Sequence, residues 1–242
     1  KWSQKDFLHY TKKLEPVLPR FESTEIINFK KNKKIKLAFL SSDIYGNHSV
    51  TYFLKALIQN VDRQKFVLVF YSNCKIEKED ENTREFKTYF DEWVNISSLN
   101  DILAINTIRK NNINIIIDLM GLTSTNRIAL FKNRLAKIQI LWLGYNNTSG
   151  LKNMDYLIAD LNLIHQDEVA YYSEKIIFLP GIWNCHSGFS ILRSNNPSPI
   201  IKNKYITFGS FNNVSKISDE VINVWSKILK NIKNSLSLTQ QR

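Results

Sequence analysis

Hydrophobic residues fall into short apolar runs, separated by stretches in which apolar side chains recur every three or four positions. Continuous apolar runs are typical of buried β-strands, and the recurring spacing is typical of amphipathic helices. We predict strands at residues 34–42, 65–73, 92–97, 113–121, 137–144, 154–160, 175–181, 205–213 and 235–238. We predict helices from the N-terminus to Pro16 and at residues 49–60, 81–90, 100–111, 124–134 and 218–232.

Strands and helices alternate between residues 34 and 180, which predicts an α/β fold. Near-continuous apolar strands indicate a parallel sheet with helices on both faces. Such sheets bind ligands at the carboxyl ends of their strands, near a switch in strand order. The stretch LWLGYNNTSG (residues 141–150) ends one predicted strand in small and polar residues. It is either a ligand loop, where Gly144 admits close backbone approach, or an ordinary turn.

The pattern changes after Pro180, where residues 181–204 are rich in Gly, Pro, Ser and Asn without a period. This composition is typical of an interdomain linker. The strands and helix that follow are too few to bury a core alone. We therefore expect a helical segment at residues 1–33, a Rossmann-like half at 34–180, a linker at 181–204, and the beginning of an incomplete second Rossmann-like half at 205–242.

The net charge of +11, from 33 basic and 22 acidic residues, favours anionic partners such as nucleic acid or phosphate-bearing ligands. The lysines are spread along the chain, and the densest run, residues 29–36, is either a solvated linker or a nucleic-acid patch. Only two cysteines occur, Cys74 and Cys185, which favours a reducing compartment. We expect a cytoplasmic protein without membrane association, and nucleic acid is the less favoured partner.

Candidate chemistry lies in the loop after the first predicted strand, which contains Asp43 and His48. A histidine near neutral pKa can accept a hydroxyl proton, and an aspartate can orient its ring. Alternatively, His48 caps the helix that begins near residue 49. Cys185 and His186 are adjacent, a poor arrangement for metal ligands, and the acidic run at residues 77–82 indicates a solvated helix start. We expect no metal site.

Four segments, SSDIYGNHS, IIIDLMGLTSTNR, WLGYNNTSG and FNNVSK, occur in an order that resembles the O-linked N-acetylglucosamine transferase (SPINDLY-type) family of glycosyltransferases. The resemblance implies a GT-B fold of two Rossmann-like domains, usually with tetratricopeptide repeats upstream. It implies inverting, metal-independent transfer from a UDP-sugar, preferably UDP-N-acetylglucosamine, to Ser or Thr of proteins. The alternatives are a UDP-glucose-dependent protein glucosyltransferase and a non-catalytic basic α/β binding module. As a partial catalytic region, the isolated chain is expected to be inactive.

The resemblance also assigns catalytic roles to particular residues. His48 and Asp43 would line the active site as candidates for the base, although their spacing is one residue longer than the family pattern, which affects the register of Asp43. Lys216 would neutralise the departing diphosphate, unless it is a solvated surface lysine. Asn213, at a position where the family often has Gln, would lie beside the diphosphate. Leu122 stands where bacterial relatives often carry His.

The remaining candidates would bind the donor. Leu143, Gly144 and Tyr145 match a family loop that surrounds the sugar and phosphates. Asn146 replaces the proline of that loop, so we expect a looser backbone and an effect on sugar selectivity. Trp183 either corresponds to the family's aromatic residue by the interdomain cleft or simply fastens the two domains together.

Overall fold

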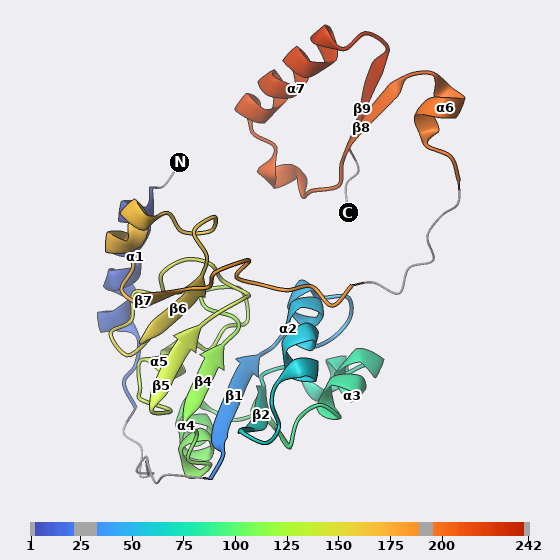
Figure 1. Ribbon diagram of the computed structural model, residues 1–242. Coiled ribbons are helices and arrows are strands. Elements are labelled where there is room, and N and C mark those ends of the chain that lie inside the picture. The colour runs from blue at the N-terminus through green and yellow to red at the C-terminus, as the bar shows by residue number, and fades with distance from the viewer. Residues whose placement is uncertain (1–2, 22–32, 189–195, 240–242) are drawn as a thin grey trace. The chain divides into compact units, whose positions relative to one another are not determined.

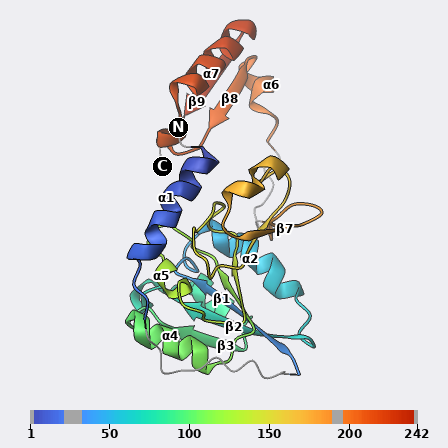
Figure 2. The same ribbon diagram turned by 90° about the vertical axis from the view of Figure 1, so that its left-hand side faces the viewer.

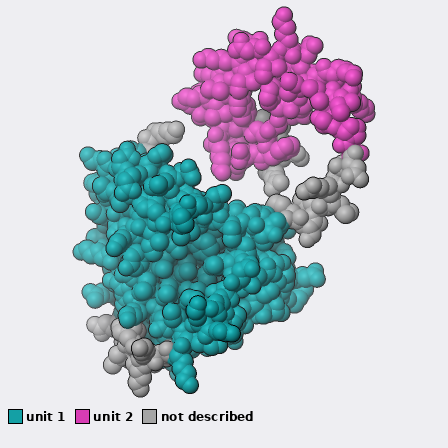
Figure 3. All heavy atoms as spheres, viewed as in Figure 1, with its two compact units in different colours: residues 1–188 teal, residues 189–242 magenta. Residues whose placement is uncertain are grey.

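The computed structural model describes residues 3–21, 33–188 and 196–239 (Figure 1). The chain forms two compact units, residues 1–188 and 189–242 (Figure 3). The first half of the basic run at 29–36 and the middle of the predicted linker lie outside the described residues. Each unit is therefore considered by itself.

Unit 1 is built on a seven-stranded sheet with the strand order β3-β2-β1-β4-β5-β6-β7 (Figure 1). All neighbouring strands in it are parallel, so the predicted fold class is confirmed. The strands are β1 (Ile35–Ser41), β2 (Phe66–Ser72), β3 (Glu92–Asn95), β4 (Ile115–Asp118), β5 (Ile138–Leu141), β6 (Tyr156–Ala159) and β7 (Lys175–Phe178).

The strand order changes direction between β1 and β4. The chain adds β2 and β3 on one side of β1, and later adds β4 to β7 on the other side. Leu40 near the end of β1 pairs with Asp118 at the end of β4. Loops that leave these two strands diverge, which leaves room for a ligand at the carboxyl edge of the sheet.

Helices cover both faces of the sheet, and Figure 2 shows them on opposite sides of the strands. On one face lie α2 (Ser49–Asn60) and α3 (Glu81–Lys87), which contribute Leu54 and Phe86 to the core. On the other lie α4 (Asp101–Lys110) and α5 (Ile128–Phe131), which contribute Ile105 and Phe131. The continuous apolar strands follow from this burial on both faces.

Two helix predictions need correction. The first helix, α1 (Gln4–Val17), does not stop at Pro16 but includes it in its last turn. The helix predicted at 124–134 forms only as α5, because Thr125 has a positive φ of 64° and Asn126 uses its side chain to accept from the N–H of Ile128. Short polar side chains of this kind compete with helical hydrogen bonds.

Two 3₁₀ turns, η1 (Ile76–Lys78) and η2 (Gln166–Tyr171), complete unit 1. The first part of the predicted linker belongs to this unit, because the N–H of Ser187 donates to the carbonyl of Tyr52 on α2 (3.1 Å). The structure places the unit boundary at residue 188.

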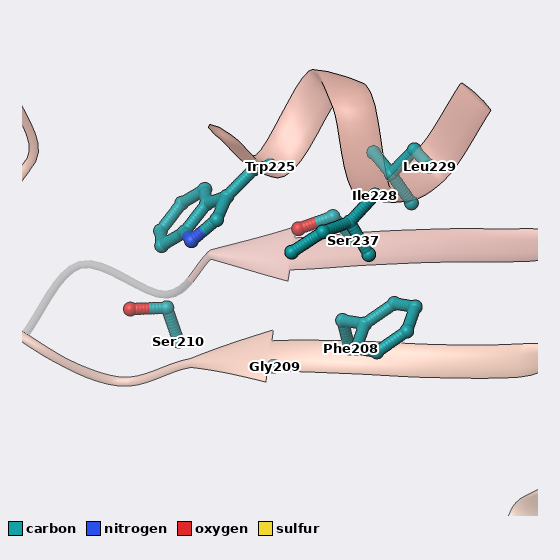
Figure 4. A pocket seen from close by; sticks show the side chains of 7 residues that line it. All are labelled: Phe208, Gly209, Ser210, Trp225, Ile228, Leu229 and Ser237. Atoms are coloured by element: carbon teal, nitrogen blue, oxygen red, sulfur yellow. The ribbon is translucent and has the colours of Figure 1, made fainter. Parts of the chain in front are cut away.

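Unit 2 contains a parallel pair of strands, β8 (Ile206–Ser210) and β9 (Ser235–Thr239), with the helix α7 (Asp219–Asn231). It also contains a 3₁₀ turn, η3 (Val214–Lys216), and a short helix, α6 (Pro199–Asn203), inside the predicted linker. A hollow of about 180 Å³ lies between α7 and the strands. Figure 4 shows the side chains that line it, among them Trp225 and Phe208. Its lining is mainly apolar and includes no predicted site residue.

Candidate functional site

A polar pocket of about 290 Å³ opens at the carboxyl edge of the sheet in unit 1. Three segments line it: the start of α2, the loop after β5, and the stretch after β7. The lining residues are His48, Ser49, Val50, Phe53, Leu143, Gly144, Asn146, Trp183 and Asn184. We call this cavity the His48 pocket. Three segments that are far apart along the chain meet there, and they bring together five residues selected from the sequence: His48, Leu143, Gly144, Asn146 and Trp183.

His48 stands at the N-terminus of α2, where its Nδ1 accepts the backbone N–H of Val50 at 3.4 Å. The capping interaction foreseen as an alternative is therefore present, although the bond is long. A ring that accepts at Nδ1 carries its neutral-state proton on Nε2. The cap thus selects one tautomer of an imidazole that also lines the pocket.

The loop after β5 makes an abrupt turn at Leu143. This residue has a φ of 79°, and the N–H of Gly144 donates to the carbonyl of Trp142 at 3.1 Å. A γ-turn of this hand is strained for a residue with a side chain. A Cβ on Gly144 would lie 1.8 Å from the carbonyl oxygen of Leu119. Gly144 is therefore required by a neighbouring loop of the protein itself, a reason that differs from the predicted approach of a ligand.

Trp183 is fastened to the sheet through its backbone. Its N–H donates to the carboxylate of Asp160 (2.8 Å), and its carbonyl accepts from the indole Nε1 of Trp142 (3.0 Å). Burial works to raise the pKa of Asp160, but hydrogen bonds from the N–H groups of Trp183, Leu163 and Asn162 hold it below the usual value. These bonds anchor the far wall of the pocket to the ends of β5 and β6.

Asp43 is held by its neighbours rather than by His48. Its Oδ1 accepts from the hydroxyl of Ser42 (2.8 Å) and its N–H donates to Ser41 Oγ (3.0 Å). Within the described part of the chain, no hydrogen bond or ion pair joins Asp43 to His48. The predicted orienting role of Asp43 has no support from this arrangement.

Asp118 is a buried carboxyl group that the sequence reasoning did not select. It ends β4, and its two oxygens accept the N–H groups of Met120 (3.0 Å) and Gly121 (3.1 Å). Burial raises its pKa to about 7 against the effect of these bonds, and the charge of Asp43 raises it further. An acidic residue directly after the isoleucine-rich run of a predicted buried strand, residues 113–117, was the signal that could have identified it.

Most polar groups at the end of the LWLGYNNTSG stretch are satisfied inside the protein. The buried carboxylate of Glu174 accepts from the hydroxyl of Thr148 (2.8 Å) and from the N–H of Ser149 (2.7 Å). Tyr145 packs against the core beside Gly121, and burial raises its pKa to about 12. The stretch is therefore a pocket-lining turn at Leu143–Asn146, followed by a buried structural turn.

The two diphosphate candidates lie in unit 2. Asn213 precedes η3 and its side-chain oxygen accepts the N–H of Ser215 at 3.0 Å, which leaves the amide NH₂ as a donor. Lys216 is exposed at the end of η3, and its N–H donates to the carbonyl of Asn213 at 3.0 Å. The two residues therefore sit on one tight turn after β8.

The arrangement of unit 1 is that of a GT-B glycosyltransferase domain. An O-GlcNAc transferase mutant from Thermobaculum terrenum superimposes with a TM-score of 0.85 at 24% identity, over 98% of this chain and 45% of that one. Residues 18–189 match Glycosyl transferase family 41, and the chain belongs to that family. The resemblance inferred from the motifs is confirmed.

Plant proteins are among the relatives. A probable UDP-N-acetylglucosamine–peptide N-acetylglucosaminyltransferase SPINDLY from Oryza sativa subsp. japonica is 33% identical over 208 residues, 84% of this chain and 22% of that protein. The SPINDLY protein of Eustoma exaltatum subsp. russellianum is 34% identical over 197 residues, 79% of this chain and 21% of that protein. The chain thus spans about a fifth of the length of these relatives.

Across residues 3–21, 33–188 and 196–239, no group of three or more His, Cys, Asp or Glu side chains is placed to hold a metal ion. Over the same residues, no helix combines the length and apolar character needed to cross a membrane.

Proposed function

We propose that this chain forms part of the catalytic region of a UDP-sugar-dependent protein O-glycosyltransferase, with UDP-N-acetylglucosamine as donor and Ser or Thr of proteins as acceptor. The observation that carries the proposal is the His48 pocket. It joins a histidine at the N-terminus of α2, which follows β1 at the switch in strand order, to the Leu143–Gly144 turn after β5. Membership of family 41 and the activity for which the SPINDLY relatives are named support this choice of donor and acceptor.

His48 is the residue that we assign to the acceptor hydroxyl. The cap bond to Val50 fixes the ring at the mouth of α2, and its Nε2–H can first donate to the hydroxyl oxygen. To act as a base, Nε2 must first lose its proton to solvent while Nδ1 gains one, which breaks the cap bond; at 3.4 Å that bond is long and weak. Nε2 then takes the hydroxyl proton as the hydroxyl oxygen bonds to the anomeric carbon and the diphosphate leaves. Proton removal of this kind contributes about 10²- to 10⁴-fold to rate.

Lys216 and Asn213 are assigned to the leaving group. A lysine ammonium and an amide NH₂ both donate hydrogen bonds to phosphate oxygens, and the charge on a UDP diphosphate grows as the glycosidic bond breaks. Their position on the same turn after β8 supports a joint role. The neutralising charge comes from the protein in this proposal.

The test is a transfer assay with labelled UDP-N-acetylglucosamine, the native-length protein and an acceptor protein. Lys216→Met should reduce transfer by at least about 10²-fold, since it removes the charge that offsets the leaving diphosphate. Lys230→Met is the matched control, because Lys230 is an exposed lysine on α7 and should tolerate the change. Circular dichroism checks that both variants fold.

Full transfer by a folded Lys216→Met variant would remove that residue from the mechanism. If UDP-glucose is consumed faster than UDP-N-acetylglucosamine, the donor assignment changes and the site assignment stands. If neither sugar is transferred, and the protein binds DNA with a steep dependence on salt, the basic binding module replaces the enzyme.

A further inference from the structure

A second polar cavity, also of about 290 Å³, lies at the same edge of unit 1, on the other side of the loop after β1. Ser42 and Tyr45 of that loop line this second cavity, whereas His48 lines the pocket described above. Its remaining walls come from the segments after β2, β3 and β4, including Asn73 and Arg127. The proposed glycosyl transfer uses none of these residues.

The charged groups that line this cavity are all cationic: Lys75, Lys78 and Arg127. Arg127 is paired with Asp101, but neither lysine forms an ion pair within the part of the chain that the structure describes. Lys78 Nζ lies 5.5 Å from the ring centroid of Tyr45, which places its charge over an aromatic wall. The cavity therefore carries an unbalanced positive charge.

Three carboxylates lie near the cavity but outside its lining. Burial raises the pKa of the Cys74 thiol, and the charges of Glu79, Asp43 and Asp80 raise it further. These carboxylates therefore lie close to Cys74. None of the three lines the cavity. Each already accepts a hydrogen bond: Asp43 from a hydroxyl, Glu79 from a lysine, and Asp80 from a backbone N–H.

The base of the cavity is rigid. The guanidinium of Arg127 donates from Nη1 to Asn73 Oδ1 (3.2 Å) and to the carbonyl of Ile96 (3.2 Å). The amide of Asn73 donates to the carbonyl of Thr125 (3.0 Å), and the hydroxyl of Thr125 shares a 2.7 Å hydrogen bond with Ser42. Thr125 is held at φ 64°, a strained value for a β-branched residue. Such strain persists only where the surroundings enforce it.

We propose that this cavity binds a phosphate group, free or as a monoester, at a site separate from the UDP-sugar site. The amide of Asn73 has a second proton to donate to the oxyanion, and Lys75 and Lys78 provide two flexible charges that can close on it. A dianion gains more from paired cations than a neutral sugar does. The volume admits a phosphate with a small substituent.

Isothermal titration calorimetry of the 242-residue chain with inorganic phosphate in dilute chloride buffer tests the site. We expect saturable binding that weakens at least about tenfold in Lys75→Gln/Lys78→Gln, roughly 1.4 kcal/mol. The control Lys137→Gln/Lys175→Gln removes the same charge from two exposed lysines elsewhere and should bind as the unchanged chain does. Both pairs are exposed, so folding should be unaffected.

Absence of saturable binding, or an equal loss in both double variants, would overturn the proposal, because bulk charge would then explain any effect. A second titration with a phosphoseryl peptide distinguishes the two sources of phosphate. Tighter binding of the peptide than of inorganic phosphate would indicate a phosphorylated protein as the ligand, and equal affinities would indicate free phosphate. UDP should not displace either probe. Displacement by UDP would make the cavity part of the donor site and also overturn the proposal. None of these readouts depends on sugar transfer.

Discussion

The carbonyl oxygen of Leu119 occupies the space in which Gly144 would carry a side chain. A Cβ at Gly144 would lie only 1.8 Å from that oxygen. The loops after β4 and β5 are thus in direct backbone contact behind the His48 pocket. The geometry of the pocket depends on this contact, because Leu143 and Asn146 flank the glycine and line the cavity.

Gly144→Ala should therefore destabilise unit 1 by about 3 kcal/mol or more, since a backbone oxygen cannot move aside as a flexible side chain would. Urea denaturation measures the change in the free energy of unfolding. Gly181→Ala is the matched control, because nothing lies within 4 Å of its added Cβ and its φ is not positive. Similar stabilities for the two variants would show that the two loops are not in contact.

The buried carboxyl of Asp118 should make stability fall as the pH rises. Its folded-state pKa, about 7, is above the ordinary aspartate value of 3.8, so as the pH rises the folded state keeps the proton longer than the unfolded chain does. The contribution of Asp118 to the free energy of unfolding is then fully present below about pH 4. It is lost between about pH 4 and pH 7, at a rate of at most about 1.4 kcal/mol per pH unit.

Asp118→Asn should remove that component of the pH dependence, because an amide does not titrate. The measurement is the free energy of unfolding at several pH values, with the exposed Asp167→Asn as a control that leaves the profile in place. Identical pH profiles for Asp118→Asn and the unchanged chain would contradict the assigned burial.

The bond between Asp160 and the N–H of Trp183 should control how firmly the wall of the pocket is held. In Asp160→Asn, one carboxylate oxygen becomes an NH₂ group, which cannot accept that N–H. A hydrogen bond to a charged group is stronger than one between neutral groups. Amide exchange at Trp183, followed by NMR, should therefore become at least about tenfold faster.

The unchanged protein should keep this protection at moderately acidic pH, because the pKa of Asp160 is lowered and the folded state holds the carboxylate charged. The protection is present above the unfolded pKa and is lost as the pH falls through the lower folded value. Unaltered exchange at Trp183 in Asp160→Asn would mean that another contact holds the segment.

The order of strands and helices in unit 1 could be predicted because apolar runs and amphipathic spacing are local properties. β1, α2 and β2 formed within one or two residues of the predicted limits. The apolar spacing at residues 124–134 predicted a longer helix than the structure contains. The prediction was wrong at its start, because Thr125 and Asn126 make local hydrogen bonds that favour a turn.

The site was predictable only in part. The motifs identified His48, Leu143 and Trp183, which do line one pocket. They could not show that Gly144 is required by Leu119, or that Thr148 and Ser149 bind a buried glutamate, because these contacts join segments that are distant in sequence. Such pairings arise from the topology of the sheet.

The central claim is that the imidazole of His48 takes part in sugar transfer, beyond its role as a helix cap. His48→Asn separates the two roles, because Asn is a favourable N-cap but has no imidazole. His48→Ala removes both and should lower the free energy of unfolding by about 1 kcal/mol. The measurement is the rate of transfer from labelled UDP-N-acetylglucosamine by the native-length His48→Asn protein. We predict a loss of about 10²-fold or more with unchanged stability. Full transfer by His48→Asn would contradict the claim and leave His48 as a cap.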